Sequence, residues 1–360
     1  MRATLLLVLS LTCACSPLMP VRQDAGEGDG GRSEVSMPGP DAGPLDAGVP
    51  TGQVQVDVLL EGRSRLGARS ARGFRPWRGG VAVVGPSLVW VESGTTPGVF
   101  RMPIEGCGGP ACVETIATVT RPSAFAALPD SVLVADVTAL RRYIIGGSVT
   151  PVATSQSELV NLATDGASAF WTTESSAILK TPFGGVTSTL INSNGTPFAM
   201  TVSGTRLNWV GVDISGLQAV MQSIGLDGRG AREDRRSGSG FQTMKGDGRF
   251  LFFARDTAPS TVVRQTLSNG LLEVVGTNAQ GVTDFAIEAT RACWTEPGTS
   301  AAANGRVRCV SHESTQAETV AEALPFPVAL VAHDGSLYVL AAGTMGEAFG
   351  DGRIVRIAWR

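Results

Sequence analysis

A short pattern recurs seven times along the chain: an apolar strand, a turn, and a second strand that carries a large anchor residue. Neighbouring anchors are 37 to 45 residues apart, and they are Trp90, Val134, Trp171, Trp209, Phe253, Trp294 and Val339. A repeat of about 40–45 residues with four strands in each unit is typical of a β-propeller blade. No stretch has the sustained 3.6-residue periodicity of a helix. The sequence therefore predicts an all-β fold, a seven-bladed β-propeller of four-stranded antiparallel blades.

Asp-Gly pairs separate the first and second strands of several repeats, at residues 165–166, 247–248 and 334–335. This pair favours the positive-φ turn that joins two antiparallel strands. The aromatic anchors lie in the middle of strands at the blade period, so we expect them to form the core between blades. The alternative is a surface on which sugars or bases stack.

The two ends of the repeat region complement each other. Residues 54–60 read as a strand that precedes the first repeat, and the last repeat ends after its third strand at 354–359. A blade built from both segments would leave no exposed sheet edge. We therefore expect the N- and C-terminal strands to close the ring in one blade, and a C-terminal truncation to unfold it.

The N-terminus reads as an export signal. One basic residue, Arg2, is followed by an apolar run at 5–11 that is too short to span a bilayer. The small residue Ala14 before Cys15 resembles the lipobox of bacterial lipoproteins, which implies cleavage after residue 14 and a lipid on Cys15. Ser16 in the next position resembles the signal for outer-membrane sorting. The sequence predicts an exported protein, lipid-anchored to the outer membrane and periplasmic or at the cell surface; the alternative is a plain secreted protein.

Residues 15–52 contain few large apolar side chains and repeat Asp-Ala-Gly at 24–26, 41–43 and 46–48. Such a segment cannot bury enough surface to offset its ordering entropy, so we expect a disordered tether between the lipid and a propeller at 53–360. A calcium loop is the alternative reading of the repeats, but they lack the glutamate that closes such a loop.

Cysteine usage supports export. With Cys13 removed and Cys15 lipidated, four cysteines remain, and four allow three pairings. Spacing favours the disulfides Cys107–Cys112 and Cys293–Cys309. A zinc site is the alternative, but the spacings differ from those of zinc ligands. The sequence predicts no metal and no cofactor.

Three repeats carry a related motif around the anchor: residues 90–92 read Trp-Val-Glu, 171–174 read Trp-Thr-Thr-Glu, and 294–296 read Trp-Thr-Glu. They resemble degenerate repeats of the Tyr-Trp-Thr-Asp class of propellers, and the layout resembles bacterial lipoproteins with a seven-bladed propeller on a tether. The resemblance covers residues 53–360. It implies a binding or scaffold protein, by analogy of fold alone.

An acidic residue lies at or after the end of the anchor strand in six repeats: Glu92, Asp136, Glu174, Asp213, Asp256 and Glu296. In a propeller the loops after the second strand share one face, so these acids are candidates for a ring at one mouth of the channel that binds a basic ligand or a cation. The alternative is that each acid accepts hydrogen bonds from its own loop backbone.

Basic residues gather in two places. Six arginines lie between Arg63 and Arg78 with Phe74 and Trp77 among them, a candidate site for anionic glycans or lipid headgroups; the alternative is a solvated connector. A second arginine cluster at 229–236 also contains two acids and reads as a surface hairpin. A net charge of −3 with a pI of about 5.6 argues against nucleic acid as a partner.

The residues for catalysis are sparse. His312 and His333 are the only histidines, and neither has a triad partner or a metal-ligand companion at useful spacing. No Gly-x-Ser-x-Gly elbow or phosphate loop is present. The sequence predicts a non-catalytic binding or scaffold lipoprotein with an unknown envelope protein or glycan as partner. The alternative is a hydrolase or lyase with its site at a channel mouth.

Overall fold

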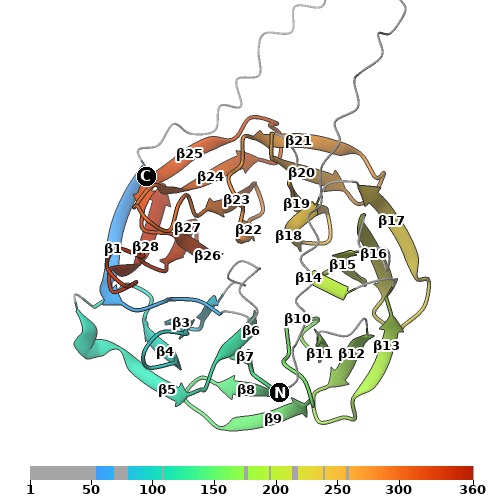
Figure 1. Ribbon diagram of the computed structural model, residues 1–360, viewed down its shortest axis with the longest axis horizontal. Helices are drawn as coiled ribbons and strands as arrows, with labels where there is room; N and C mark the ends of the chain where they lie inside the picture. The colour runs from blue at the N-terminus through green and yellow to red at the C-terminus, as the bar shows by residue number, and fades with distance from the viewer. Residues whose placement is uncertain are drawn as a thin grey trace, which may run out of the picture. The chain divides into compact units, whose positions relative to one another are not determined.

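The computed structural model describes residues 54–68, 80–107, 109–173, 177–193, 196–212, 218–237, 240–256 and 259–359. The predicted signal peptide, Cys15 and the tether lie outside these residues. The described residues form seven four-stranded antiparallel sheets, arranged as blades around a common centre (Figure 1). The prediction of an all-β, seven-bladed propeller is confirmed.

Each blade runs outward from a short inner strand, so strand order repeats around the ring. The inner strands are β2 (Val81–Val84), β6 (Pro122–Ala127), β10 (Asn161–Thr164), β14 (Thr196–Ser203), β18 (Gly240–Gly246), β22 (Phe285–Ile287) and β26 (Pro327–His333). The second strands, which carry the anchors, are β3 (Ser87–Glu92), β7 (Ser131–Asp136), β11 (Ser168–Thr172), β15 (Arg206–Val212), β19 (Phe250–Asp256), β23 (Arg291–Glu296) and β27 (Ser336–Ala341).

The third strands are β4 (Gly98–Pro103), β8 (Ala139–Ile144), β12 (Ala177–Pro182), β16 (Ala219–Gly225), β20 (Thr261–Thr266), β24 (Gly305–Ser311) and β28 (Gly352–Trp359). The outer strands are β5 (Glu114–Thr118), β9 (Val149–Thr154), β13 (Ser188–Asn192), β17 (Arg232–Ser237), β21 (Leu272–Thr277), β25 (Glu318–Leu324) and β1 (Val54–Arg63). The only helix among the described residues is a 3₁₀ turn, η1 (Pro110–Cys112).

The last blade is closed by both ends of the chain, as predicted. Its strand order is β1-β28-β27-β26, so the first described strand is the outermost strand of the seventh blade. The register pairs Val54 with Trp359 and Val58 with Val355, and Figure 1 places blue β1 beside red β28. Arg356 on β28 reinforces this pairing, because its guanidinium donates hydrogen bonds to Asp57 Oδ2 at 2.9 Å and to Glu105 Oε2 at 3.0 Å.

The hydrophobic core is divided among the blade interfaces. Seven clusters of buried residues are present, and each combines side chains from two neighbouring blades. The tryptophan anchors Trp90, Trp171, Trp209 and Trp294 are at most 2% exposed. This confirms the anchors as inter-blade core. Burial of side chains this large is the main stabilising term that holds one blade against the next.

The predicted turns are present. Gly166, Gly248 and Gly335 have φ values of 89°, 96° and 70°, the left-handed region that glycine adopts without strain. At Gly248 the backbone also passes close to the neighbouring blade, since a Cβ there would lie 3.5 Å from Gly204 Cα. A Cβ at this distance would make an ordinary contact, so the positive φ, and not lack of space, favours glycine here.

Candidate functional site

Four of the six acids proposed for a ring at one mouth lie among the described residues: Glu92, Asp136, Asp256 and Glu296. Glu174 and Asp213 lie outside them. Each described acid is the last residue of the second strand of its blade. None of the four lines the cavity at the centre of the ring, as far as the structure describes it.

Glu92 is 3% exposed and ties the first blade to the closing strand. Its Oε1 accepts hydrogen bonds from Trp90 Nε1 at 2.8 Å and from Arg63 Nε on β1 at 2.6 Å. Burial raises the pKa of this carboxyl, and the bonds to Arg63 and Trp90 oppose the shift. The carboxylate therefore acts inside the fold, where it satisfies an indole N–H and a cation from the next blade.

Glu296 repeats this arrangement in the sixth blade and is 1% exposed. Its Oε1 accepts a hydrogen bond from Trp294 Nε1 at 2.9 Å, and its Oε2 accepts one from Arg306 Nε at 2.7 Å. Arg308 Nη1 lies 3.4 Å from Oε1, and the backbone N–H of Gln280 donates to Oε2 at 3.3 Å. A buried carboxylate with four donors has its hydrogen-bonding capacity filled by the protein itself.

The other two described acids differ from each other. Asp136 is 8% exposed and accepts hydrogen bonds from the backbone N–H groups of Thr120 and Arg121 at 2.8–3.1 Å, in the loop that enters its own blade. Asp256 is exposed and has no hydrogen-bond or ion-pair partner among the described residues. Backbone contacts of the kind that the alternative reading expected therefore occur at Asp136 and Glu296. The acid ring as a binding surface stays a prediction.

A cavity of about 360 Å³ lies at the centre of the ring, and the sequence analysis did not single out its residues. All seven blades contribute, mostly through inner strands: its lining includes Val81, Phe125, Asn161, Met200, Lys245, Asp284 and Val331. The volume falls in the range of about 300–1,000 Å³ that is common for small-molecule sites. The lining combines apolar side chains with a few polar groups, which is the usual composition of such sites.

Two opposite charges lie next to each other on the wall of this cavity. Lys245 lies on β18 and Asp284 directly precedes β22, and Lys245 Nζ is 3.9 Å from Asp284 Oδ1. The backbone N–H of Phe285 donates to Asp284 Oδ1 at 2.8 Å, and that of Leu330 on β26 donates to Oδ2 at 3.2 Å. The carboxylate thus connects three blades.

The environment of the two charges is unequal. The side chain of Asp284 is 17% exposed and that of Lys245 is 42% exposed. Burial raises the pKa of the Asp284 carboxyl, and the Lys245 charge and the two backbone hydrogen bonds oppose the rise. A desolvated carboxylate beside a more exposed ammonium, in a cavity of ligand size, is a recognised marker of a functional site.

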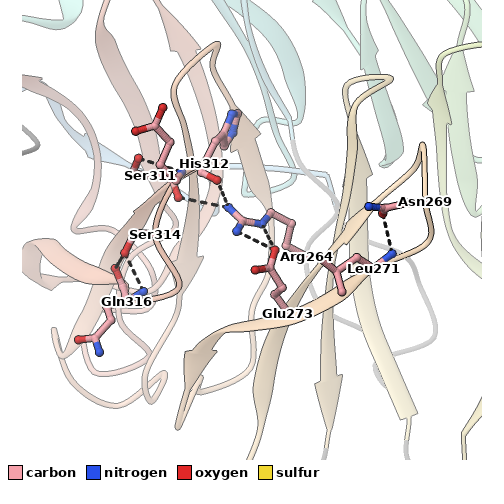
Figure 2. Close-up of polar contacts among 9 residues, drawn as sticks. Arg264, Asn269, Leu271, Glu273, Ser311, His312, Ser314 and Gln316 are labelled. Carbon is pink, nitrogen blue, oxygen red and sulfur yellow. Dashed lines mark hydrogen bonds and ion pairs between the residues drawn. The ribbon is translucent and has the colours of Figure 1, made fainter. Parts of the chain in front are cut away.

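His312 packs between the fifth and sixth blades rather than in the central cavity. Its ring lies against Phe250, with centroids 4.8 Å apart, and burial lowers its pKa below the ordinary value. Figure 2 shows Arg264 donating to Glu273 Oε2 in its own blade and, across the blade interface, to the carbonyl oxygens of Ser311 and His312. Arg264 is 4% exposed, so this network belongs to blade packing.

His333, the second histidine, ends β26, and its Nε2 lies 3.2 Å from Asp334 Oδ2. Within the described ranges, no three His, Cys, Asp or Glu side chains gather in a way that could hold a metal ion. In the same part of the chain, no helix is both long enough and apolar enough to cross a membrane.

Both predicted disulfides are present, Cys107–Cys112 in the loop before β5 and Cys293–Cys309 between β23 and β24. The second joins residues directly opposite each other in the strand register, with Cα atoms 4.0 Å apart. Disulfides persist in oxidising compartments. The two pairs therefore fit an exported protein.

The basic segment at 63–78 is described only in part. Arg63 binds Glu92, and the Arg65 guanidinium lies 5.2 Å from the centre of the Phe349 ring; Arg69, Arg72, Arg75 and Arg78 lie outside the described residues. In the second cluster Arg232 pairs with Asp234 at 2.6 Å on β17, at the surface of the fourth blade. The first cluster as a glycan or headgroup site remains a prediction.

No protein-family model matches the chain, and no curated protein matches it. Solved structures match through the fold. A chain of the mitotic checkpoint complex has a TM-score of 0.57 and 11% identity, over 78% of this chain and 90% of that chain. A puromycin-hydrolysing peptidase from Mycobacterium tuberculosis has a TM-score of 0.56 and 13% identity, over 78% of this chain and 53% of the peptidase.

A computationally designed protein, Ika8, is also similar, with a TM-score of 0.54 and 11% identity over 82% of this chain and 98% of the designed one. The three matches span a checkpoint complex, a peptidase and a design. Identities this low show a shared propeller fold and nothing of function. The 945 matching chains make the same point, because a fold this common does not narrow the function.

Sequence analysis missed Lys245 and Asp284, although one signal was present. Inner strands of this chain are built mostly of small or apolar residues, and Lys245 is one of only two lysines in the sequence. A charged residue at such a position is unusual next to the crowded axis of a propeller. The partner Asp284 carries no comparable signal, because its approach to Lys245 depends on how two blades pack.

Proposed function

We propose that this protein is a lipid-anchored binding protein of the cell envelope that holds a small ligand in the central cavity. The observation that carries the proposal is the pair of Lys245 and Asp284 on the wall of a cavity of about 360 Å³. The cavity receives residues from every blade, so a ligand there would contact the whole ring.

The charges define the chemistry of the ligand. Lys245 Nζ is 3.9 Å from the nearest carboxylate oxygen of Asp284, which is beyond direct hydrogen-bond distance, and the lysine side chain is 42% exposed. A ligand with an anionic group toward Lys245 and a hydrogen-bond donor or amine toward Asp284 would give each of these two side chains a direct partner. An amino acid or a similar small zwitterion has this pattern.

Binding is favoured over catalysis by the way Asp284 is held. Both of its oxygens accept backbone N–H groups, from Phe285 and from Leu330. Such bonds fix the position of a charge, which is what recognition of a ligand requires. A hydrolase or lyase that uses a channel mouth is the alternative that the sequence left open.

Two observations support the proposed lipid anchor: the N-terminal sequence and the presence of disulfides. The apolar run at 5–11 and Ala14-Cys15 predict cleavage after residue 14 and lipidation of Cys15. The disulfide Cys293–Cys309 supports export. The outer membrane is the membrane that Ser16 favours, and the segment to residue 52 would then act as the tether.

The ligand is tested with the full chain, expressed in a bacterium that exports and lipidates it. Native mass spectrometry of the purified protein is expected to show a small molecule bound at one per chain. Lys245→Gln and Asp284→Asn should each lose it, whereas the exposed control Asp256→Asn should keep it. Equal occupancy in all four proteins would move the ligand site away from the cavity.

The anchor is tested separately. Intact-mass analysis of the N-terminal peptide is expected to find diacylglycerol on Cys15, and Cys15→Ser should release the protein from the membrane fraction. A soluble wild-type protein with an unmodified N-terminus would disprove the anchor and leave the cavity proposal intact.

A further inference from the structure

The tryptophan anchors of three blades each donate their indole N–H to an acceptor of their own blade. Trp90 and Trp294 donate to the glutamates two residues later, at 2.8 Å and 2.9 Å. Trp171 donates to Thr181 Oγ1 at 2.9 Å. The repeat therefore satisfies this buried donor within the fold, as buried polar groups normally require.

The fourth blade breaks the pattern. Residue 211, two positions after Trp209, is glycine where the first and sixth blades have glutamate. Trp209 is 1% exposed, and its Nε1 is buried with no hydrogen-bond partner among the described residues. A buried donor without an acceptor destabilises the folded state unless something else supplies one.

A second cavity, of about 200 Å³, lies at this position. It is lined by residues of β13, the loop after it, β15, β16, β17 and the residue before β17: Ile191, Asn192, Ser193, Trp209, Gln222, Ala231, Arg232 and Glu233. We call it the Trp209 cavity. It is separate from the central cavity, because the two share no lining residue.

Gln222 adds a second polar group to the Trp209 cavity. It pairs directly with Trp209 in the register of β15 and β16 and is 8% exposed. Its side-chain amide has no hydrogen-bond partner in the described part of the chain. An indole donor and an amide that can both donate and accept thus lie side by side without internal partners.

The charges around the Trp209 cavity favour an uncharged ligand. Arg232 Nε pairs with Asp234 Oδ1 at 2.6 Å and donates to Ser223 Oγ at 3.1 Å, and Glu233 is exposed. By contrast, each glutamate that serves a tryptophan elsewhere has an arginine within 2.6–2.7 Å. The Arg232 charge is already matched by Asp234, so a carboxylate ligand would be desolvated here without a cation of its own, which is unfavourable.

We propose that the Trp209 cavity binds a secondary amide, of the kind present in an N-acetyl group or a peptide bond. The ligand carbonyl accepts the Trp209 indole N–H, and the ligand N–H donates to the side-chain oxygen of Gln222. The acetyl methyl group packs against Ile191. This site is independent of the central cavity and of its proposed ligand.

The test follows the indole N–H of Trp209 by two-dimensional ¹H–¹⁵N NMR on the full chain, with the resonance assigned from its loss in Trp209→Phe. The probes are N-acetylglucosamine, glucosamine, and N-acetylalanine N-methylamide. We expect a saturable shift of the Trp209 signal with an amide probe, with a dissociation constant on the order of 1 mM for so small a ligand. Glucosamine, which lacks the amide, should cause none.

The probes also distinguish the source of the amide. A response to N-acetylglucosamine alone indicates a sugar, a response to the blocked alanine alone indicates a peptide, and a response to both supports the shared chemistry. The proposal would be overturned if neither amide shifted the Trp209 signal at a concentration about 50 times the expected dissociation constant of about 1 mM. An equal shift with glucosamine would also overturn it.

Two variants check the mechanism. Gln222→Leu places at this position the residue that the third blade has opposite its own tryptophan, Leu179, so the fold should tolerate it. It should weaken amide binding at least tenfold. Gly211→Glu supplies the carboxylate of the first and sixth blades, and it should shift the Trp209 signal without ligand and block the probe; Gly211→Ala controls for the added Cβ. Unchanged amide affinity in Gln222→Leu would contradict the assigned contacts.

Discussion

The role of Glu296 inside the fold can be measured directly. In Glu296→Ala, Trp294 Nε1 and Gln280 N–H lose their acceptor, and Arg306 and Arg308 lose their counter-charge. Removing one partner of a buried ion pair typically costs about 3–5 kcal/mol. The Arg306 side chain is 32% exposed, so solvent screens part of this loss and we expect about 3 kcal/mol.

This free energy converts into a change in melting temperature. At about 2.1 cal/mol/K per residue, a ring of roughly 300 residues has an unfolding entropy near 0.6 kcal/mol/K. A loss of about 3 kcal/mol then lowers the melting temperature by about 5 °C, which calorimetry at pH 7 resolves. Glu296→Gln keeps an acceptor for the indole and should lie between wild type and Glu296→Ala.

Asp256→Ala is the matched control, because Asp256 ends the second strand of its blade as Glu296 does but is exposed. It should change stability by less than about 0.5 kcal/mol. If Glu296→Ala were as harmless as Asp256→Ala, the buried network would not stabilise the ring, and the acid ring as a binding surface would regain support.

Three further perturbations test the packing. Burial lowers the pKa of His312, so the unfolded chain binds its proton more readily, and the stability measured in urea should fall as pH drops below about 6.5; the pH slope should be smaller in His312→Phe. Arg356→Met removes two hydrogen bonds from the closing blade, to Asp57 and Glu105, and should lower the urea midpoint by the equivalent of about 1–2 kcal/mol. Replacing both Cys293 and Cys309 by alanine should cost about 3 kcal/mol in thermal unfolding.

Each of these has a contrary outcome. An identical pH slope in wild type and His312→Phe would show that the imidazole titrates freely. An unchanged midpoint in Arg356→Met would mean that the strand pairing of β1 with β28 alone holds the ring closed. If the double alanine variant melted at the same temperature as the wild-type protein, the Cys293–Cys309 disulfide would not stabilise the fold.

The sequence predicted the fold well because the propeller repeats its signals. Seven anchors at one period, and a strand at each end of the region without a complete blade, led to the observed ring and to the β1–β28 pairing. Residues 318–324 form a strand, as the repeat requires, although they contain helix-favouring residues. Position in the repeat therefore outweighs local propensity.

The candidate sites were less accessible to sequence reasoning. The acids at the strand ends share a position in the repeat, but burial and donors differ for each, as the contrast between Glu296 and Asp256 shows. Those differences come from the neighbouring blade and are invisible in a single repeat. Gly211 could have been noticed, because Trp-x-Gly departs from the Trp-x-Glu of two other blades.

Closure of the ring by β1 also constrains how the protein folds during its synthesis. β1 can pair only after β28, almost 300 residues later in the chain, has been synthesised. Contacts between residues this distant in sequence form slowly. Until then Val54, Val56 and Val58 lie on an unpaired strand, and they remain 37–48% exposed even after pairing. Such a strand pairs readily with other chains. A cell that makes this protein must therefore shield its first strand throughout synthesis, and crowded nascent chains are expected to exchange β1 strands before each ring closes on itself.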